Sequence, residues 1–107
     1  MAEQMSFAEF EHSLAKDAAP PAWFGAPLRA LWFEAKGDWH RAHALAQVED
    51  GDGHAGAWVH AYLHRKEGDE SNAAYWYARA GRPVATGNLE AEWRAILTEL
   101  LRSAEQK

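Results

Sequence analysis

The sequence predicts an all-α fold, with about six helices in a single helical domain that covers residues 1–107. Three observations lead to this prediction. Apolar residues recur three and four positions apart along several segments, these segments end at glycine or proline, and one helix–turn–helix pattern occurs twice, 31 residues apart from Gly37 to Gly68. No segment alternates apolar and polar residues over the length of a strand, so we expect no β-sheet.

The first helix is expected over about 6–17. Ser6 and Glu9 have the spacing of a capping box, in which each side chain accepts a hydrogen bond from the other residue's amide. Pro20 and Pro21 then interrupt the chain, because proline has no amide hydrogen and disfavours helix in the residue before it. In the linker that follows, we expect Trp23 and Phe24 to pack against the core.

The second and third helices are expected on either side of Gly37 and Asp38. Pro27 suits the first turn of the second helix, because its missing amide needs no partner there. Gly37 allows the left-handed conformation that ends one helix, and Asp38 caps the amides of the next. The third helix should run from Trp39 to about Val48.

The fourth and fifth helices are expected over about 54–67 and 70–80, and they are separated by a second Gly-Asp pair, Gly68-Asp69. Glycine and proline, at Gly81 and Pro83, end the fifth helix. The sixth helix is expected over about 88–105, with an apolar stripe at helical spacing that comprises Leu89, Trp93, Ile96, Leu97, Leu100 and Leu101.

The repeated pattern has the composition of two helical hairpins. Each copy places alanine, Ala42 or Ala73, five residues after its glycine, and small residues let two helices approach closely. One hairpin cannot bury its apolar faces alone, so the two units should stack. We expect hairpins at about 27–50 and 54–83, with the first and sixth helices as caps.

These residues carry a family resemblance. The pattern Gly68-Asp69-x-x-x-Ala73-x-x-x-Tyr77-x-x-Ala80 resembles the second half of a tetratricopeptide (TPR) repeat, and the Trp76-Tyr77 pair is similar to that of its Sel-type variants. The stretch from Ala57 to Gly81 also resembles a family of small proteins that has no assigned activity. The resemblance implies a TPR-like helical fold and brings no catalytic residues with it.

Composition excludes several classes of function. The formal net charge is −5 and no basic patch offsets it, so we expect no binding to nucleic acid. The chain has no cysteine, which excludes disulfides and thiolate chemistry. No apolar run is long enough for a membrane span, and no signal peptide is evident, so we expect a cytoplasmic protein without membrane contact.

The glycine motif from Gly51 to Gly56 matches the letters of a dinucleotide-binding loop. That function requires a strand before the motif, whereas a helix is expected there. Acidic side chains within and before the motif would also repel a pyrophosphate. We therefore expect no nucleotide cofactor.

Histidines are the main candidates for chemistry. His60 and His64 are four residues apart and share a helical face, and His40 and His43 form a comparable stripe on the third helix. If the two helices face each other, four imidazoles can converge. His60 and His64 also have the spacing of a zinc-protease helix, but Ala61 occupies the position where that motif needs its glutamate base, which argues against peptidase chemistry.

Two hypotheses of function remain. The first is a non-catalytic protein-interaction or scaffold module of TPR-like type, in which a groove binds a protein or peptide. The residues expected to line this groove are His60, His64, Tyr75 and Arg79. The alternative is a small-ligand or transition-metal-binding protein, which an enzymatic activity could accompany. The ligands expected in that case are His40, His43, His60 and His64. The apolar stripe of the sixth helix also suggests a homo-oligomer.

Overall fold

The chain forms an all-α structure, as expected. The computed structural model describes residues 5–47 and 54–105, and within them it contains six helices and no strand. The helices are α1 (Phe7–Lys16), α2 (Ala26–Ala35), α3 (Trp39–Ala46), α4 (His54–Lys66), α5 (Glu70–Ala80) and α6 (Leu89–Glu105). The expected end of the third helix at Val48, and the glycine motif up to Gly53, lie outside the described residues.

The capping signals in the sequence form the expected bonds. At the start of α1, Ser6 Oγ accepts from the Glu9 amide at 3.1 Å, and Glu9 Oε1 accepts from the Ser6 amide at 2.8 Å. This reciprocal pair is a complete capping box and fixes where α1 begins.

The two Gly-Asp junctions are built in the same way. Gly37 and Gly68 have φ angles of +91° and +89°, which side chains with a Cβ rarely adopt. The aspartates that follow them cap the next helix: Asp38 Oδ1 accepts from the Arg41 amide at 3.1 Å, and Asp69 Oδ1 accepts from the Asn72 amide at 3.3 Å. The α2–α3 and α4–α5 pairs therefore reverse through equivalent turns.

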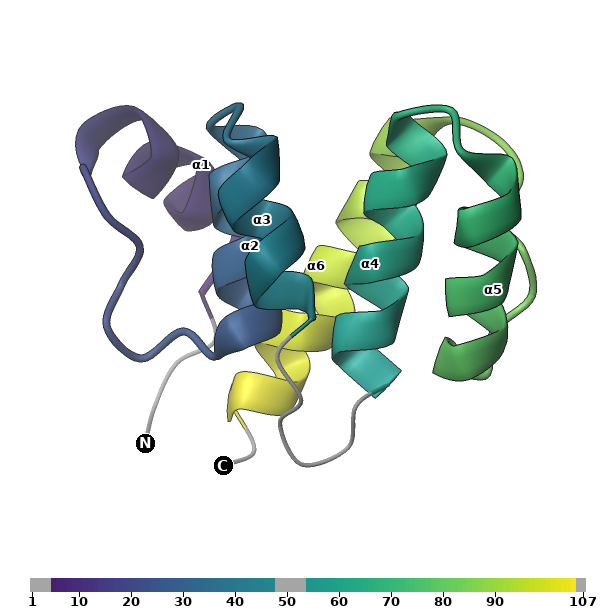
Figure 1. Cartoon of the computed structure of the whole chain (residues 1–107). Coiled ribbons are helices and arrows are strands. Elements are labelled where there is room, and N and C mark those ends of the chain that lie inside the picture. Colours follow the sequence, from purple (N-terminus) through teal and green to yellow (C-terminus); the bar gives the residue numbers. More distant parts are fainter. Residues whose placement is uncertain (1–4, 48–53, 106–107) are drawn as a thin grey trace.

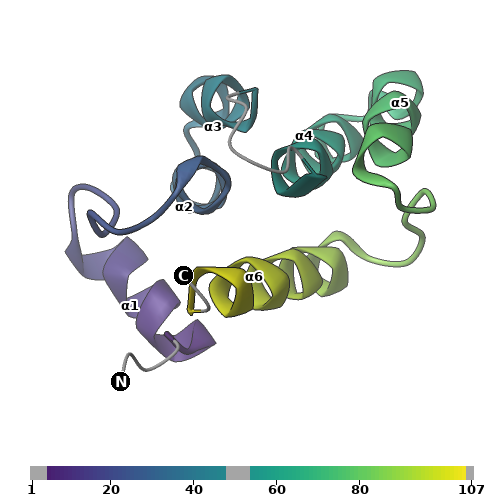
Figure 2. The ribbon, with the colours of Figure 1, turned by 90° about the horizontal axis from the view of Figure 1, so that it is seen from below.

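The two helix pairs stand beside each other, with α3 next to α4 (Figure 1). Seen from below, α6 runs across both pairs and contacts α2 and α4, while α1 lies at the opposite end from α5 (Figure 2). This arrangement makes α4 the central helix, since it contacts α2, α3, α5 and α6.

The core is arranged around α4, the central helix. Every residue from Gly56 to His64 is buried, so even the side chains opposite the apolar face of this helix point into the protein. The largest fully buried side chains come from every helix except α3: Trp32, Tyr77, Phe10, Leu31, Leu63, Ile96, Leu97, His60 and Val59.

The apolar stripe of α6 is largely covered within the chain itself. Ile96, Leu97, Leu100 and Leu101 are buried, and Trp93 packs edge-on against Phe10 with ring centroids 5.7 Å apart. The expected self-association through this helix therefore has little apolar surface left to use.

The expectation that Trp23 packs against the core was wrong. Trp23 is 53% exposed, whereas its neighbour Phe24 is buried as expected. Apart from histidines, the buried polar side chains among the described residues are Ser13, Glu34 and Glu92. Glu34 is paired with the Lys66 ammonium group, and Ser13 accepts a hydrogen bond from Trp32 Nε1 at 3.0 Å.

None of the described helices combines the length and apolar character needed to cross a membrane.

Candidate functional site

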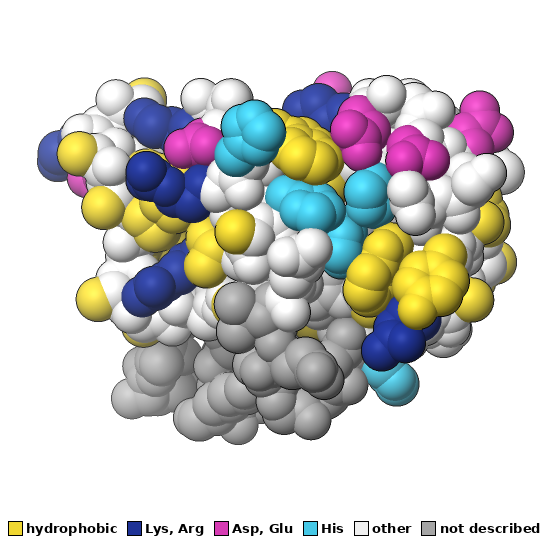
Figure 3. All heavy atoms as spheres, viewed as in Figure 1, with side chains coloured by type: hydrophobic (Ala, Val, Ile, Leu, Met, Phe, Trp, Pro, Cys, Tyr) yellow, Lys and Arg dark blue, Asp and Glu magenta, His cyan; other side chains and the backbone are white. Residues whose placement is uncertain are grey.

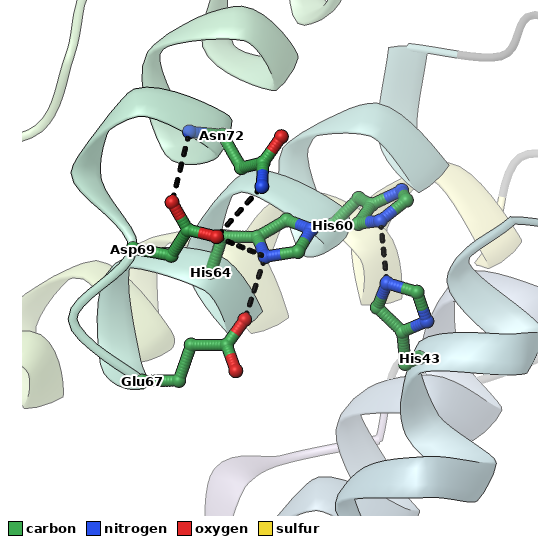
Figure 4. A network of polar contacts seen from close by, with 6 residues as sticks. All are labelled: His43, His60, His64, Glu67, Asp69 and Asn72. Carbon is green, nitrogen blue, oxygen red and sulfur yellow. Dashed lines mark hydrogen bonds and ion pairs between the residues drawn. The ribbon is translucent and has the colours of Figure 1, made fainter.

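Three of the four candidate histidines meet between α3 and α4. His43 projects from α3, and His60 and His64 project from the facing side of α4, one turn apart (Figure 4). In the space-filling view, histidine side chains gather on the face where these two helices lie side by side (Figure 3). We call His43, His60 and His64 the histidine cluster.

The rings of the histidine cluster are in direct contact. His60 Nε2 lies 2.9 Å from His43 Nε2, so one of these nitrogens donates a hydrogen bond to the other. The ring centroids are 4.5 Å apart for His43 and His60, and 4.9 Å apart for His60 and His64. One nitrogen from each of the three side chains lies within 4.8 Å of the other two.

Two tryptophans hold the planes of these rings. Trp39 stacks on His43 with a centroid separation of 4.7 Å and an interplanar angle of 16°. Trp76, from α5, stacks on His60 at 3.9 Å and 19°. Because a stacked aromatic face leaves an imidazole little room to tilt, the two tryptophans fix the planes in which the nitrogen lone pairs of His43 and His60 lie.

Two carboxylates lie near the Nδ1 atom of His64. Its Nδ1 is 2.7 Å from Glu67 Oε1 and 4.0 Å from Asp69 Oδ2 (Figure 4). Asp69 also accepts from Asn72, through Nδ2 at 2.6 Å and through the backbone amide at 3.3 Å. His64 therefore has one nitrogen next to Glu67, and its other nitrogen is left to face the cluster.

The environment keeps two of the three imidazoles uncharged at neutral pH. Burial, followed by the nearby His43 and His64 rings, lowers the pKa of His60 from its ordinary 6.5 to about 4. Burial and His64 also lower the pKa of His43, and Glu67 partly opposes this shift. A neutral imidazole keeps a lone pair on one nitrogen, and that lone pair can bind a metal ion.

One buried nitrogen of the cluster has no hydrogen-bond partner among the described residues. His60 is 2% exposed, and among the described residues its Nδ1 is a buried atom with no hydrogen-bond partner. Leaving a buried polar group unpaired costs about 1–3 kcal/mol. Within the described part of the chain, this nitrogen of His60 is therefore not satisfied by a protein group.

The remaining predicted site residues lie outside the cluster. His40 is exposed and touches the edge of Trp39, with ring centroids 5.7 Å apart. Tyr75 is 54% exposed on α5, where Arg79 Nη1 donates to its hydroxyl at 3.4 Å. The predicted groove set is thus divided, with His60 and His64 buried and Tyr75 and Arg79 at the surface.

The sequence did not identify four residues as neighbours of the cluster: Trp39, Trp76, Glu67 and Asp69. Glu67 carried a usable signal, because it follows His64 by three residues, a spacing that brings side chains together at the end of a helix. Asp69 belongs to the second Gly-Asp pair and caps α5, but its position beside His64 depends on the turn at Gly68.

Comparison of the chain with protein-family models, curated proteins and solved structures found no match.

Proposed function

We propose that this protein binds a divalent transition-metal ion between α3 and α4, with His43, His60 and His64 as its ligands. The observation that carries the proposal is the convergence of three imidazoles from two helices, each with a nitrogen within 4.8 Å of the others. Neutral imidazole is a preferred ligand of Zn²⁺, Cu²⁺ and Ni²⁺.

The three side chains would have to adjust to hold such an ion, because cluster nitrogens that lie up to 4.8 Å apart must approach one another. Zinc–nitrogen bonds of about 2.0–2.1 Å in tetrahedral geometry place two ligand nitrogens roughly 3.3 Å apart. His43 and His60 Nε2 are 2.9 Å apart and now share a proton. A metal ion would bind both Nε2 atoms in place of this hydrogen bond, with the donating ring carrying its proton on Nδ1 instead, and the two rings would separate by a few tenths of an ångström.

Metal binding accounts for the cluster better than a peptide groove does. A groove needs its recognition residues at the surface, whereas His60 and His64 are 2% and 8% exposed. The lowered pKa of His60 also favours a metal, because an imidazole must be unprotonated to ligate one.

Thermal unfolding of tag-free, chelator-treated protein tests the proposal. At a free Zn²⁺ or Ni²⁺ concentration of 100 times Kd, the native state gains about 2.7 kcal/mol. This gain raises Tm by on the order of 10 °C for a domain of this size. Calorimetric titration should give one ion per chain, and Mg²⁺ should have no effect because it prefers oxygen ligands.

The variants that accompany this test separate the cluster from other histidines. His60→Ala/His64→Ala should abolish the Zn²⁺-dependent rise in Tm, and the half-buried His43→Gln, a milder change, should reduce it. His12→Ala and His40→Ala, which alter exposed histidines outside the cluster, should keep it. The absence of any shift with Zn²⁺, Ni²⁺ or Cu²⁺, or an equal shift in the double variant, would refute the proposal.

A further inference from the structure

We infer that Glu67 is a positioning residue for the metal site: it holds His64 in the tautomer and orientation that aim the Nε2 lone pair at His43 and His60. This inference rests on the proposed function for its consequence, but the state of the His64 ring can be measured without any metal. Glu67 itself is not assigned as a ligand.

The first step of the argument is the contact between Glu67 and His64. Glu67 directly follows the last residue of α4, and its Oε1 lies 2.7 Å from His64 Nδ1. A carboxylate accepts hydrogen bonds and cannot donate one, so His64 must carry its proton on Nδ1. In a neutral ring this leaves Nε2 unprotonated.

The second step is where that Nε2 atom points. The His64 ring has its centroid 4.9 Å from that of His60, its Nδ1 edge faces Glu67, and its other nitrogen lies on the side of His60, away from Glu67 (Figure 4). If the ring turned over, Nδ1 would leave the carboxylate. The bond to Glu67 therefore fixes both the protonation and the direction of the ring.

The third step distinguishes Glu67 from Asp69, the other carboxylate nearby. Asp69 lies 4.0 Å from His64 Nδ1, beyond a hydrogen bond, and both of its oxygens already accept from Asn72. The side chains of Glu67 and Asp69 are almost equally exposed, at 38% and 40%. Asp69 is therefore a matched control in burial and charge.

This arrangement predicts how metal affinity depends on Glu67. Outer-shell carboxylates that hold a ligating histidine typically change metal affinity 10- to 100-fold when they are altered. Glu67→Gln should weaken Zn²⁺ binding by that factor, because the neutral amide no longer favours the Nδ1–H tautomer. Asp69→Asn keeps an oxygen that can cap α5, and its affinity should stay within about threefold of the wild-type value.

The test begins with the metal-free protein. Ring ¹⁵N NMR at pH 8, above the ordinary pKa of histidine, reports which nitrogen of His64 carries the proton. We expect the Nδ1–H tautomer in the wild-type protein and in Asp69→Asn, and a shift toward Nε2–H in Glu67→Gln. An Nε2–H ring in the wild-type protein would overturn the inference, whether or not the protein binds metal.

Zinc titration of the same three proteins completes the test. The expected tautomers together with a 10- to 100-fold loss confined to Glu67→Gln support the inference. The expected tautomers without Zn²⁺ binding in any protein support the role of Glu67 in fixing the ring and refute the proposed function. Equal losses in Glu67→Gln and Asp69→Asn, or two ions per chain, would overturn the inference, because the carboxylates would then be ligands themselves.

Discussion

Replacing Arg65 by methionine is expected to lower the free energy of unfolding by about 3–5 kcal/mol, the largest effect of any single substitution considered for this protein. Arg65 Nη1 donates to Glu92 Oε1 at 2.8 Å, and the side chain of Glu92 is only 5% exposed. Without the guanidinium, this carboxylate stays buried without a positive partner.

The bonds that remain to Glu92 do not replace Arg65. Trp58 Nε1 at 3.2 Å and the Tyr77 hydroxyl also donate to the carboxylate, but neither carries a charge. Arg65 additionally donates to the Gly87 carbonyl, so its replacement also removes a hydrogen bond to the segment before α6. Because Arg65 follows His64 directly, this network fixes the part of α4 that presents the cluster.

Urea unfolding measures the expected loss, and the chain offers a matched control. Arg94 and Glu90 form an ion pair at 3.2 Å with side chains 48% and 72% exposed, and Arg94→Met should cost less than about 1 kcal/mol. Glu92→Gln added to Arg65→Met should recover part of the loss, because the buried charge is then removed. A cost for Arg65→Met no greater than that for Arg94→Met would contradict the role of Arg65 as the necessary partner of the buried Glu92 carboxylate.

The second large effect is a loss of stability on acidification in metal-free protein. The folded state holds the pKa of His60 at about 4, whereas an unfolded chain restores it to about 6.5. Between these values the unfolded state binds a proton that the folded state does not. Stability should therefore fall by up to about 1.4 kcal/mol per pH unit as pH decreases from 6.5 to 4.

The groups that face His60 set this direction. They are His43 from α3, His64 from the same helix and the uncharged Trp76 from α5. Among the described residues, burial acts most strongly on the pKa of His60, followed by His43 and His64, and all three lower it. Denaturant unfolding from pH 7.5 to 4, with a chelator present, measures the slope in the wild-type protein and in His60→Asn. The variant should show a shallower slope, and identical slopes would contradict a neutral, buried His60.

The helices were predictable because their signals are local. The Ser6–Glu9 capping box and the two Gly-Asp turns form within a few residues, and the structure contains each of them. Their effect does not depend on how the helices later pack.

The site was predictable only in part. His60 and His64 share a face of α4 because of their spacing, and the sequence shows this directly. On α3, His40 and His43 are three residues apart and lie on one broad stripe, so the sequence could not show which one would turn toward α4. Tertiary packing decides: Trp39 stacks on His43 and leaves His40 exposed.

The buried carboxylates were not predictable from local pattern. Glutamate is read as a surface residue because it is almost never fully buried without a partner. The partners of Glu34 and Glu92 are Lys66 and Arg65, which lie 32 and 27 residues away along the chain. Only the packing of α4 against α2 and α6 brings these charges together.

The most direct test of the proposal that His43, His60 and His64 bind a metal ion is to locate the ion in a crystal structure. Crystals of tag-free protein equilibrated with Zn²⁺ can be measured on both sides of the zinc absorption edge. We expect one anomalous peak per chain between α3 and α4, about 2.0–2.1 Å from one nitrogen each of His43, His60 and His64. A peak at exposed histidines alone, or no peak at the cluster when the soak contains saturating Zn²⁺, would contradict it.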